Sequence, residues 1–445
     1  MMRTGWRPST LALCLALVGA ASSANAVDLM RSFALARQQE PNFRAAMAAA
    51  EANREALPQA MSQLLPNLSF SGASNKVNLD QSVNNFNSTF DYFSSNYSMV
   101  LRQPLYRRSQ IAQYDQALAQ VKAADEDEQR AGFDLLQRVA GAYFEALFAQ
   151  DVSVFMQSLR AATEGQLRAA QRNFELGQGT RTDIDEAQAR LDMAMSQVLQ
   201  ASQQVHYTRQ QLQALINEEV GDLAVLDIAR FAPQQLQQPL DHWLNLAQDR
   251  NPELRMALAR VEAARQEIIK TQSGHLPTLD LVAQRTLSRS ENVLNPVASY
   301  FSTQAGVQLS VPLYSGGYVD SSIRQASASL QREEQLLEQA RRSLSLQVRK
   351  EYQNLTEGLM RMKALEQAVR SAEQLVLSSQ KGVQAGTRTQ TDVLNAIQRR
   401  AESLRDLAQA RYQYLIAELR LRSLTGDVPE DIAQGTNQVL RPGAP

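Results

Sequence analysis

Apolar residues recur every three or four positions through two unusually long stretches of the chain, roughly Ser109 to Leu176 and Tyr318 to Ala385. The recurring positions include, in the first stretch, Leu136, Ala140, Tyr143 and Leu147 and, in the second, Leu365, Ala368, Ala372 and Leu375. This spacing is typical of a coiled-coil seam, where alanine lets two helices approach closely. Neither stretch contains proline, so each predicts a continuous helix about 100 Å long at about 1.5 Å per residue. Amphipathic helices of an ordinary bundle share the spacing but rarely need such length.

A period of two residues marks two predicted β-hairpins, at about 67–104 and 278–312. In the first, Leu68 and Phe70 alternate with serines, and in the second Leu279 and Leu281 alternate with polar residues. Residues 73–95, rich in Asn and Ser, predict an exposed loop between the first two strands, the second of which ends at Pro104; a polar loop around Asn292 separates the other two. One apolar face and one small or polar face are typical of a barrel with lipid outside and water inside. A sandwich, or a sheet packed on helices, is the alternative.

These hairpins supply only four strands. A bacterial membrane barrel needs about eight or more, and an open sheet edge in lipid leaves backbone groups without hydrogen bonds. If the sheet enters a membrane, several chains must therefore share it.

The chain also contains an internal repeat. The segment Gly386-Thr-Arg-Thr-Gln-Thr-Asp-Val-Leu-Asn-Ala396 matches Gly177-Gln-Gly-Thr-Arg-Thr-Asp-Ile-Asp-Glu-Ala187 at an offset of 209 (392 − 183 = 209). Each copy predicts a break between two helices, released by Gly177 or Gly386 and followed by a helix that Thr and Asp cap. Other recurring landmarks are Leu65-Pro66 with Leu276-Pro277, Pro104-Leu-Tyr with Pro312-Leu-Tyr, and Pro41-Asn42 with Asn251-Pro252. Their common order predicts two similar halves.

The repeat defines the expected domain organisation. Residues 27–220 form the first half and 241–428 the second, each with a helix, a hairpin and two long helices. Residues 221–240 are an irregular linker between the halves, and 429–445 are a loose tail. The first helix of each half is expected at 28–61, with a kink or short break at Pro41, and at 241–272. The return helices are expected at 183–216 and 392–424.

The N-terminal residues 1–26 resemble a secretory signal peptide. Arg3 and Arg7 precede an apolar run, and Ala24-Asn-Ala26 is a small-x-small cleavage site. We therefore expect export from the cytoplasm and cleavage after Ala26. The only cysteine, Cys14, lies inside this segment; a faint lipoprotein cleavage box around it is disfavoured because bulky Leu13 precedes the cysteine. Removal of the segment would leave no thiol for disulfide bonds.

Composition and motifs argue against catalysis and against nucleic acid. The formal net charge is −1, which gives no electrostatic basis for binding nucleic acid. The three histidines, His206, His242 and His275, form no metal-spaced pair, and the chain has no phosphate-binding glycine loop or Gly-x-Ser-x-Gly elbow. No enzyme activity, metal or cofactor is predicted.

The duplicated halves, together with Val311-Pro-Leu-Tyr-Ser-Gly-Gly317 and Ala385-Gly-Thr-Arg-Thr-Gln-Thr-Asp-Val-Leu-Asn-Ala396, resemble the TolC family of outer-membrane channel proteins. The resemblance covers nearly all of the chain after the signal peptide. It implies a mainly α fold with β: a long antiparallel α-helical, coiled-coil barrel continuing into a trimeric 12-stranded transmembrane β-barrel, four strands per chain. It also implies the outer membrane of a Gram-negative bacterium, surrounding lipid, a periplasmic adaptor protein, and an inner-membrane ABC exporter or proton-driven pump.

The resemblance further implies that the two breaks form the closed periplasmic tip of the tunnel. By position, Asp392 should face the pore, Thr387 and Arg388 should hold the tip shut, and Asp183 should be a polar partner on the neighbouring helix pair. Relatives often have a second acid at the position of Asn395, so the acidic ring would be thinner here.

Two further features qualify that assignment. Relatives often have a tyrosine at the position of Val383, which here cannot donate a hydrogen bond. The residues alone also allow Arg388 and Asp392 to be a simple helix-surface pair. At the other end of the helices, the expected strand-to-helix junctions contain Pro104, Pro312, Gly316 and Gly317.

The sequence thus predicts a passive outer-membrane channel-tunnel that a pump and adaptor supply, most consistent with type I protein secretion. The alternatives are a duct for multidrug or small-molecule efflux and a soluble periplasmic coiled-coil adaptor or scaffold. The channel hypothesis predicts that Asp392 and Arg388 control the tip.

Overall fold

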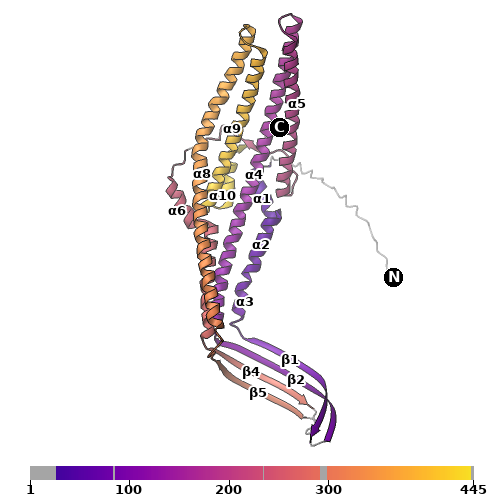
Figure 1. The fold of residues 1–445 in the computed structure, drawn as a ribbon, viewed down its shortest axis with the longest axis vertical. Coiled ribbons are helices and arrows are strands. Elements are labelled where there is room, and N and C mark those ends of the chain that lie inside the picture. Colours follow the sequence, from indigo (N-terminus) through magenta and orange to yellow (C-terminus); the bar gives the residue numbers. More distant parts are fainter. Residues whose placement is uncertain (1–26, 84–85, 234, 291–297, 442–445) are drawn as a thin grey trace, which may run out of the picture.

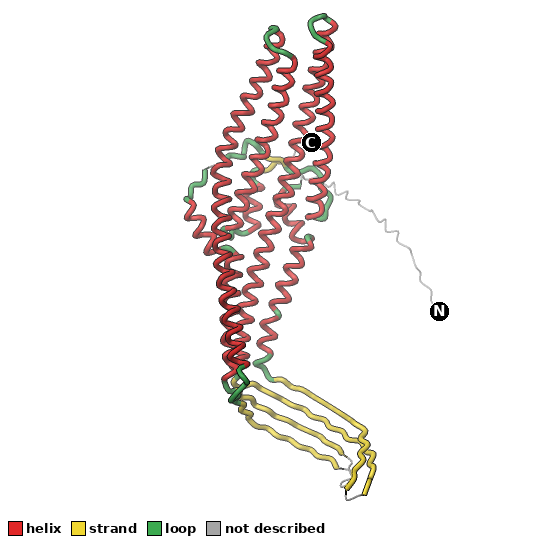
Figure 2. Tube along the Cα trace, in the orientation of Figure 1, coloured by secondary structure: helices red, strands yellow, loops and turns green. Residues whose placement is uncertain are grey.

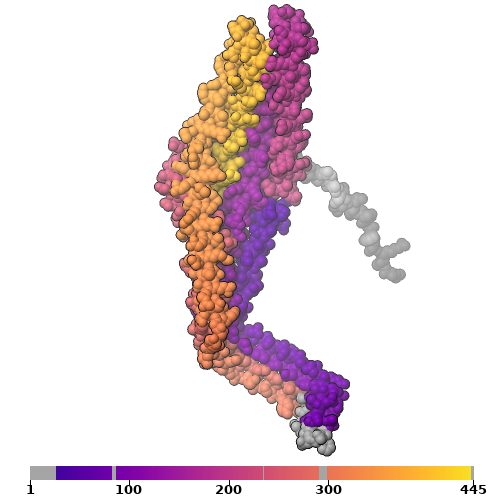
Figure 3. Space-filling view, viewed as in Figure 1, coloured from indigo at the N-terminus to yellow at the C-terminus, as the bar shows by residue number. Residues whose placement is uncertain are grey.

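The computed structural model describes residues 27–83, 86–233, 235–290 and 298–441. Long helices run along most of the molecule, and a four-stranded sheet projects from one end at an angle (Figures 1 and 2). The space-filling view shows a narrow, elongated molecule (Figure 3). The predicted signal peptide with Cys14, the cleavage site before Val27 and the loop around Asn292 fall outside the described residues.

The four long helices end within two residues of the predicted positions. Helix α4 spans Arg108–Glu175 and returns as α5, Arg181–Ile216; helix α8 spans Tyr318–Gln384 and returns as α9, Gln390–Leu424. Each pair packs side by side as an antiparallel hairpin (Figure 1). At the end that lies far from the sheet, each hairpin turns in its own loop (Figure 2).

Shorter helices begin each half. The first half has α1 (Leu29–Gln39), α2 (Pro41–Arg54) and α3 (Ala56–Ser62); the second has α6 (Leu240–Arg250), α7 (Pro252–Gln272) and the 3-10 turn η1 (Ser273–His275). The predicted break at Pro41 is confirmed, and Pro252 marks its counterpart. A side chain caps the helix after each break: Glu40 accepts a hydrogen bond from the Phe43 N–H at 2.6 Å, and Asn251 accepts one from the Leu254 N–H at 3.2 Å.

The sheet consists of β1 (Asn67–Val83), β2 (Phe86–Tyr106), β4 (Thr278–Ser290) and β5 (Ala298–Ser310), antiparallel and in that order. The expectation of a loop at 73–95 is wrong, because residues 73–83 and 86–95 belong to paired strands. Pro104 does not end the second strand either: the strand continues to Tyr106, with a register shift between Pro104 and Tyr106. A proline is tolerated there because an irregular position leaves its nitrogen outside the ladder.

The register confirms the predicted alternation of faces. One face carries exposed apolar side chains, namely Leu68, Phe70, Met99, Leu101, Leu281, Val307 and Leu309. On the other face Gln284 donates to Ser98 Oγ at 3.1 Å and accepts from Gln304 at 3.0 Å. The sheet is therefore apolar on one side and hydrogen-bonding on the other near the helices.

The main core lies midway along the helices, where the N-terminal and C-terminal segments meet α4 and α9. Buried Tyr143 donates from its hydroxyl to the carbonyls of Val27 (3.1 Å) and Ala224 (2.8 Å).

The expectation of a loose tail is wrong for residues up to 441. Helix α10 (Pro429–Asn437) buries Ile432 and Ala433, and strand β6 (Leu440–Arg441) pairs with β3 (Val225–Leu226) inside the linker. Burial of this apolar surface stabilises the tail against the linker.

Four elements lie side by side in each of three parts of the molecule: the sheet, the helices between the sheet and the core, and the helices beyond the core. In the sheet the order is β1, β2, β4, β5; in the adjoining helical part α2 packs on α4, α4 on α7 and α7 on α8; beyond the core α5 packs on α4, α4 on α9 and α9 on α8. Helix α8 therefore lies at one edge on both sides of the core, and α6 packs against part of it. The opposite edge is formed successively by β1, by α2 with α3, and by α5.

Candidate functional site

The two helix breaks have the same backbone structure. Gly177 and Gly386 have φ of 71° and 70°, the left-handed region that favours glycine. The following residue closes a six-residue hydrogen bond in both breaks, from the Gln178 N–H to the Asn173 carbonyl and from the Thr387 N–H to the Gly382 carbonyl, each 2.8 Å. This is the Schellman arrangement, which satisfies carbonyls at a helix C-terminus.

Both following helices begin with a capping box. Thr180 and Thr389 are the N-caps, and Asp183 and Asp392 are the third helical residues. The Thr180 N–H donates to Asp183 at 2.8 Å, and the Thr389 N–H donates to Asp392 at 2.9 Å. In return each aspartate N–H donates to the threonine hydroxyl at 3.2 Å. The predicted capping by Thr and Asp is confirmed, and it gives both aspartates a local structural role.

The carboxyl of Asp392 has a pKa below its usual value. The Thr389 N–H and hydroxyl lower the pKa of the Asp392 carboxyl, and the charge of Arg388 lowers it further. Asp392 is therefore a fixed negative charge next to the break, which is the electrostatic property that a cation-binding constriction requires.

Arg388 lies outside helix α9, because it precedes the N-cap Thr389. Its side chain crosses back over Gly382 and donates to Ser379 Oγ at 3.0 Å. A Cβ on Gly382 would lie 2.9 Å from Arg388 Cγ, so the glycine makes room for the arginine stem. The interpretation of Arg388 and Asp392 as a helix-surface pair is wrong. Arg388 instead binds the end of α8 and holds the break against it. Thr387 contributes to the same contact, since its hydroxyl donates to the Gly382 carbonyl.

Polar contacts join the two hairpins near the breaks. Thr391 donates from its hydroxyl to Glu186 Oε2 at 2.7 Å. Arg190 donates to Asn395 Oδ1 at 3.2 Å and to Gln398 Oε1 at 3.1 Å. Asn395 therefore contacts α5 of its own chain rather than standing alone.

A small apolar cluster lies beside these contacts, formed by Leu167, Ala170, Ala187 and Leu394. The structure thus places Asp392, Arg388, Thr387 and Asn395 at the second break and Asp183 at the first.

The sequence did not identify Glu186 or Arg190. The repeat offset offered one signal, since Glu186 is the counterpart of Asn395 (395 − 209 = 186).

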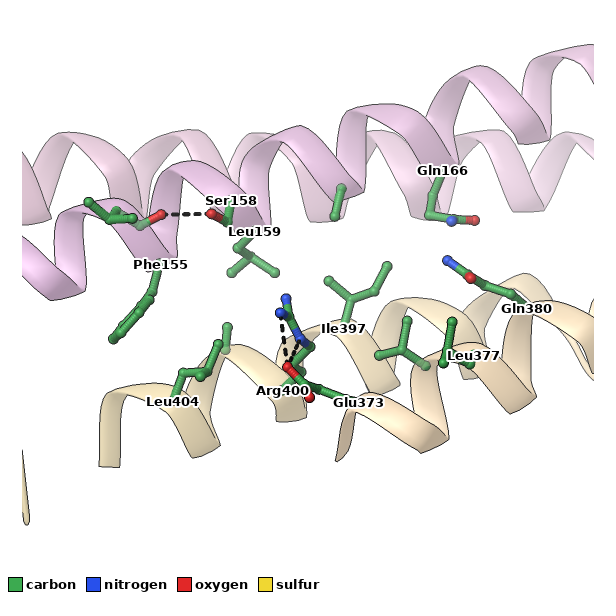
Figure 4. Close-up of a pocket in the computed structure, with 14 residues that line it drawn as sticks. Phe155, Ser158, Leu159, Gln166, Glu373, Leu377, Gln380, Ile397, Arg400 and Leu404 are labelled. Carbon is green, nitrogen blue, oxygen red and sulfur yellow. Dashed lines mark hydrogen bonds and ion pairs between the residues drawn. The ribbon is translucent and has the colours of Figure 1, made fainter. Parts of the chain in front are cut away.

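Between the breaks and the core, a groove of ≈ 820 Å³ separates α4 from α8 and α9. Phe155 and Leu159 of α4 face Ile397 and Leu404 of α9, and Gln166 and Gln380 point toward each other from opposite walls (Figure 4). Within the second hairpin, Arg400 forms an ion pair with Glu373 at 3.2 Å. The two hairpins thus leave a gap along this length.

The hairpins meet again at the core. Tyr412 of α9 donates from its hydroxyl to Asp151 Oδ2 of α4 at 2.7 Å, and the Tyr412 ring lies 5.9 Å from that of Phe144. Burial raises the pKa of Asp151 and also raises the pKa of Tyr412. Each chain therefore has two joined hairpins, fixed near the core and fastened again beside the breaks.

The junction between sheet and helices is also ordered. Gly316 and Gly317 have φ of 62° and 80°, and Gly317 is the N-cap of α8. Pro312 lies two residues after the end of β5. Arg107, immediately before α4, forms two hydrogen bonds to buried Asp280 of β4, at 2.8 and 2.5 Å. The Arg107 pair, which the sequence did not identify, ties the start of α4 to the sheet.

Within the described ranges, no helix is long and apolar enough to cross a membrane. The same part of the chain holds no group of three or more His, Cys, Asp or Glu side chains placed to bind a metal ion.

The arrangement of two duplicated helix–hairpin–helix halves with a common tip defines a class of outer-membrane channel proteins. Residues 33–218 and 243–427 match the family model described as outer membrane efflux protein, so the chain belongs to that family. The two matches begin 210 residues apart (243 − 33 = 210), in agreement with the offsets in the sequence.

Individual relatives agree with this assignment. The chain is 34% identical to the alkaline protease secretion protein AprF of Pseudomonas aeruginosa over 91% of this chain and 85% of the relative. It is 32% identical to the outer membrane protein TolC of Vibrio cholerae over 96% and 97%. Its fold is similar to the crystal structure of the outer membrane protein VceC from Vibrio cholerae, with a TM-score of 0.75 at 17% identity, over 89% of this chain and 96% of that one.

The TolC-like fold and the outer-membrane location are therefore confirmed, and the homologues are channel proteins rather than enzymes. Channels of this family work with inner-membrane pumps and adaptors. The soluble adaptor hypothesis is set aside on the same grounds.

Proposed function

We propose that three copies of this chain form an outer-membrane exit duct for unfolded proteins that a type I secretion system delivers. An inner-membrane exporter would supply the energy, and a periplasmic adaptor would dock the duct to it. The duct itself is passive, with no bound cofactor.

The main support for a trimer is that the sheet has two open edges. The sheet ends at β1 and β5, each with one row of backbone groups that has no strand beside it within the chain. In lipid such rows need partners. Joining β5 of one copy to β1 of the next would satisfy them, and three copies would give a closed barrel of twelve strands, inside the known size range.

The helical part supports the same assembly. The edge helix α8 exposes Leu336, Leu346 and Met360, and the edge helix α5 exposes Met193, Leu199 and Tyr207. Large apolar side chains on both free edges favour contact between copies. The breaks of three copies would then converge, and the fixed charge of Asp392 would lie near its two equivalents, as the gate hypothesis requires.

Two relatives favour protein secretion as the role. They are AprF and the proteases secretion protein PrtF of Dickeya chrysanthemi, which is 30% identical over 94% of this chain and 92% of the relative. Small-molecule efflux is the second candidate. It is favoured by the outer membrane efflux protein BepC of Brucella suis, 25% identical over 73% of this chain and 69% of the relative.

Complementation distinguishes the two roles. The chain would be expressed in a Gram-negative host that lacks its own channel of this family but carries a protease-secreting ABC exporter and a drug pump, each with its adaptor. We expect protease in the culture medium and little recovery of drug resistance. Recovery of drug resistance without protease secretion would instead support efflux.

A matched pair of variants tests the sheet faces in the same host. Val307→Arg places a charge on the apolar face, which costs about 2–4 kcal/mol near the middle of the bilayer. Gln304→Arg adds the same charge to the polar face. We expect the first variant to abolish insertion and the second to preserve it.

A further inference from the structure

Two arginines lie on the otherwise apolar face of the sheet. Arg285 of β4 is paired in register with Met99 of β2 and Thr303 of β5. Arg289, four residues further from the helices, is paired with Ser95 and Ser299. Because alternate residues of a strand share a face, both lie on the face that carries Leu281.

Their position along the sheet is at the outer limit of the apolar face. Five rows of β4 on this face run from Leu279 to Leu287, and Arg285 lies in the row next to the last. The last row contains Tyr97, Leu287 and Phe301, and beyond it the row of Arg289 contains serines. Aromatic girdles mark the interface of membrane barrels, and the rings of Tyr97 and Phe301 are 40% and 70% exposed.

A third cation completes the group. Lys76 of β1 lies on the same face, opposite Phe93 and one row beyond Arg289. Strands lie about 4.8 Å apart and residues rise about 3.4 Å each, so the attachment point of Arg289 lies about 14 Å from that of Arg285 and about 12 Å from that of Lys76, whereas Lys76 and Arg285 are about 22 Å apart. We call Lys76, Arg285 and Arg289 the outer basic patch.

The described residues provide no anion for the outer basic patch. No ion pair joins its members to a described carboxylate. The described acids on this face lie further out and have partners of their own: Asp91 accepts a hydrogen bond from Asn78 at 2.9 Å, and Asp80 accepts one from Thr89 at 2.5 Å. The three cations at this lipid boundary therefore lack a described counter-charge, which an external anion would supply.

We propose that the outer basic patch binds the phosphate groups of the glycolipid in the outer leaflet, lipopolysaccharide. Arginine donates paired hydrogen bonds to phosphate oxygens, and the long side chain of Arg285 reaches the headgroup level while its stem stays in the apolar zone. The proposal rests on the proposed function, because a channel whose helices lie in the periplasm directs the far end of the sheet outward. Three such patches surround the trimer.

The test uses the full chain, purified in detergent and titrated with deep-rough lipopolysaccharide or with the same lipid after removal of its phosphates. The variant is the double substitution Arg285→Gln, Arg289→Gln. The control is Arg102→Gln, which removes one positive charge from the polar face of the sheet, where Arg102 is paired with Val282. Bound lipid per trimer is counted by native mass spectrometry.

We expect the double variant to bind phosphorylated lipid about thirtyfold more weakly, since each arginine near an anionic surface contributes about fivefold. The control should bind as the wild type does. Equal binding by the double variant, or equal binding of the dephosphorylated lipid to the wild type, would overturn the proposal. Channel conductance is measured on the same samples: normal conductance with unchanged lipid binding rejects only the patch, whereas a wild type that forms no channel rejects the proposed function itself.

Discussion

Arg190 joins the two helical hairpins beside the breaks, and its removal should loosen the closed tip. Arg190 of α5 donates two hydrogen bonds to α9, to Asn395 and to Gln398. We propose that opening of the tip moves the two hairpins of a chain apart. Arg190→Ala removes both bonds and leaves the capping boxes of the breaks in place.

The size of the effect follows from the exposure of these bonds. Hydrogen bonds to a charged group contribute about 1.5–3 kcal/mol when buried, but these lie partly or fully in solvent, where about 0.5–1 kcal/mol each is realistic. Losing both therefore destabilises the closed arrangement by about 1–2 kcal/mol in each chain. That energy changes the ratio of open to closed tips by about 5–30-fold per chain.

Single-channel recording in planar bilayers measures the change directly. We expect Arg190→Ala to show a higher conductance or a larger open fraction than the wild type. The matched control is Arg399→Ala at the counterpart position in the second half (399 − 209 = 190), where the side chain is exposed. If Arg190→Ala conducts like the wild type while remaining inserted, or if Arg399→Ala changes conductance equally, the reasoning is wrong.

Three further predictions concern single positions. Asp392→Ala and Asp392→Asn should both weaken block by divalent cations, but only the alanine variant should lose about 1 kcal/mol of capping and exchange amide hydrogens faster at the start of α9; unchanged block in both would contradict the gate assignment. Gly386→Ala should lower the free energy of unfolding by about 1 kcal/mol, and with it the thermal midpoint, because Gly386 has a positive φ. The control Gly165→Ala lies inside α4, where nothing lies within 4 Å of the new methyl, and it should not lower the thermal midpoint. Glu40 has its pKa lowered from 4.5 to about 2, chiefly by the side-chain hydrogen bond from Arg138. Its stabilisation is therefore present above about pH 4.5 and is lost as the pH falls toward 2. This shift corresponds to a contribution of about 3 kcal/mol to the free energy of unfolding. The thermal midpoint of the wild type should therefore fall with pH in this range, and that of Glu40→Gln should lack this part of the decrease. Equal acid dependence of the two proteins would refute the assignment.

The long helices were predictable because their ends carry strong local signals. Gly386 adopts a conformation that favours glycine, and Thr389 with Asp392 closes a capping box within four residues. Such signals act between neighbours in the sequence, so they can be read without the fold. The same holds for the break at Pro41, since proline cannot continue the preceding helix.

The full length of the strands could not be read from the sequence. In residues 73–83 and 86–95 the alternation changes face: Val77 and Leu79, paired with Tyr92 and Phe90, lie on the face opposite to that of Leu68 and Phe70, so a single apolar face cannot be followed along the sequence. Pairing between β1 and β2 holds them as strands nevertheless. The hydrophobic pattern therefore reports where one face of the sheet is apolar, not where the strands end.

Contacts between distant segments were also beyond the sequence. Helix α10 depends on burial of Ile432 and Ala433, and β6 on pairing with a linker strand more than 200 residues earlier. The contacts of Arg190 depend on how α5 and α9 are rotated against each other, and no local spacing encodes that rotation. The position of Arg388 before the N-cap likewise follows from its fit over Gly382.

The central claim is that one chain provides only a third of a closed channel, which three chains form together. The mass of the detergent-purified mature protein tests it most directly, measured by native mass spectrometry with the conductance of the same sample in a planar bilayer. The account predicts a particle of three chains that forms a pore. A stable single chain that remains soluble without detergent and forms no pore would contradict it.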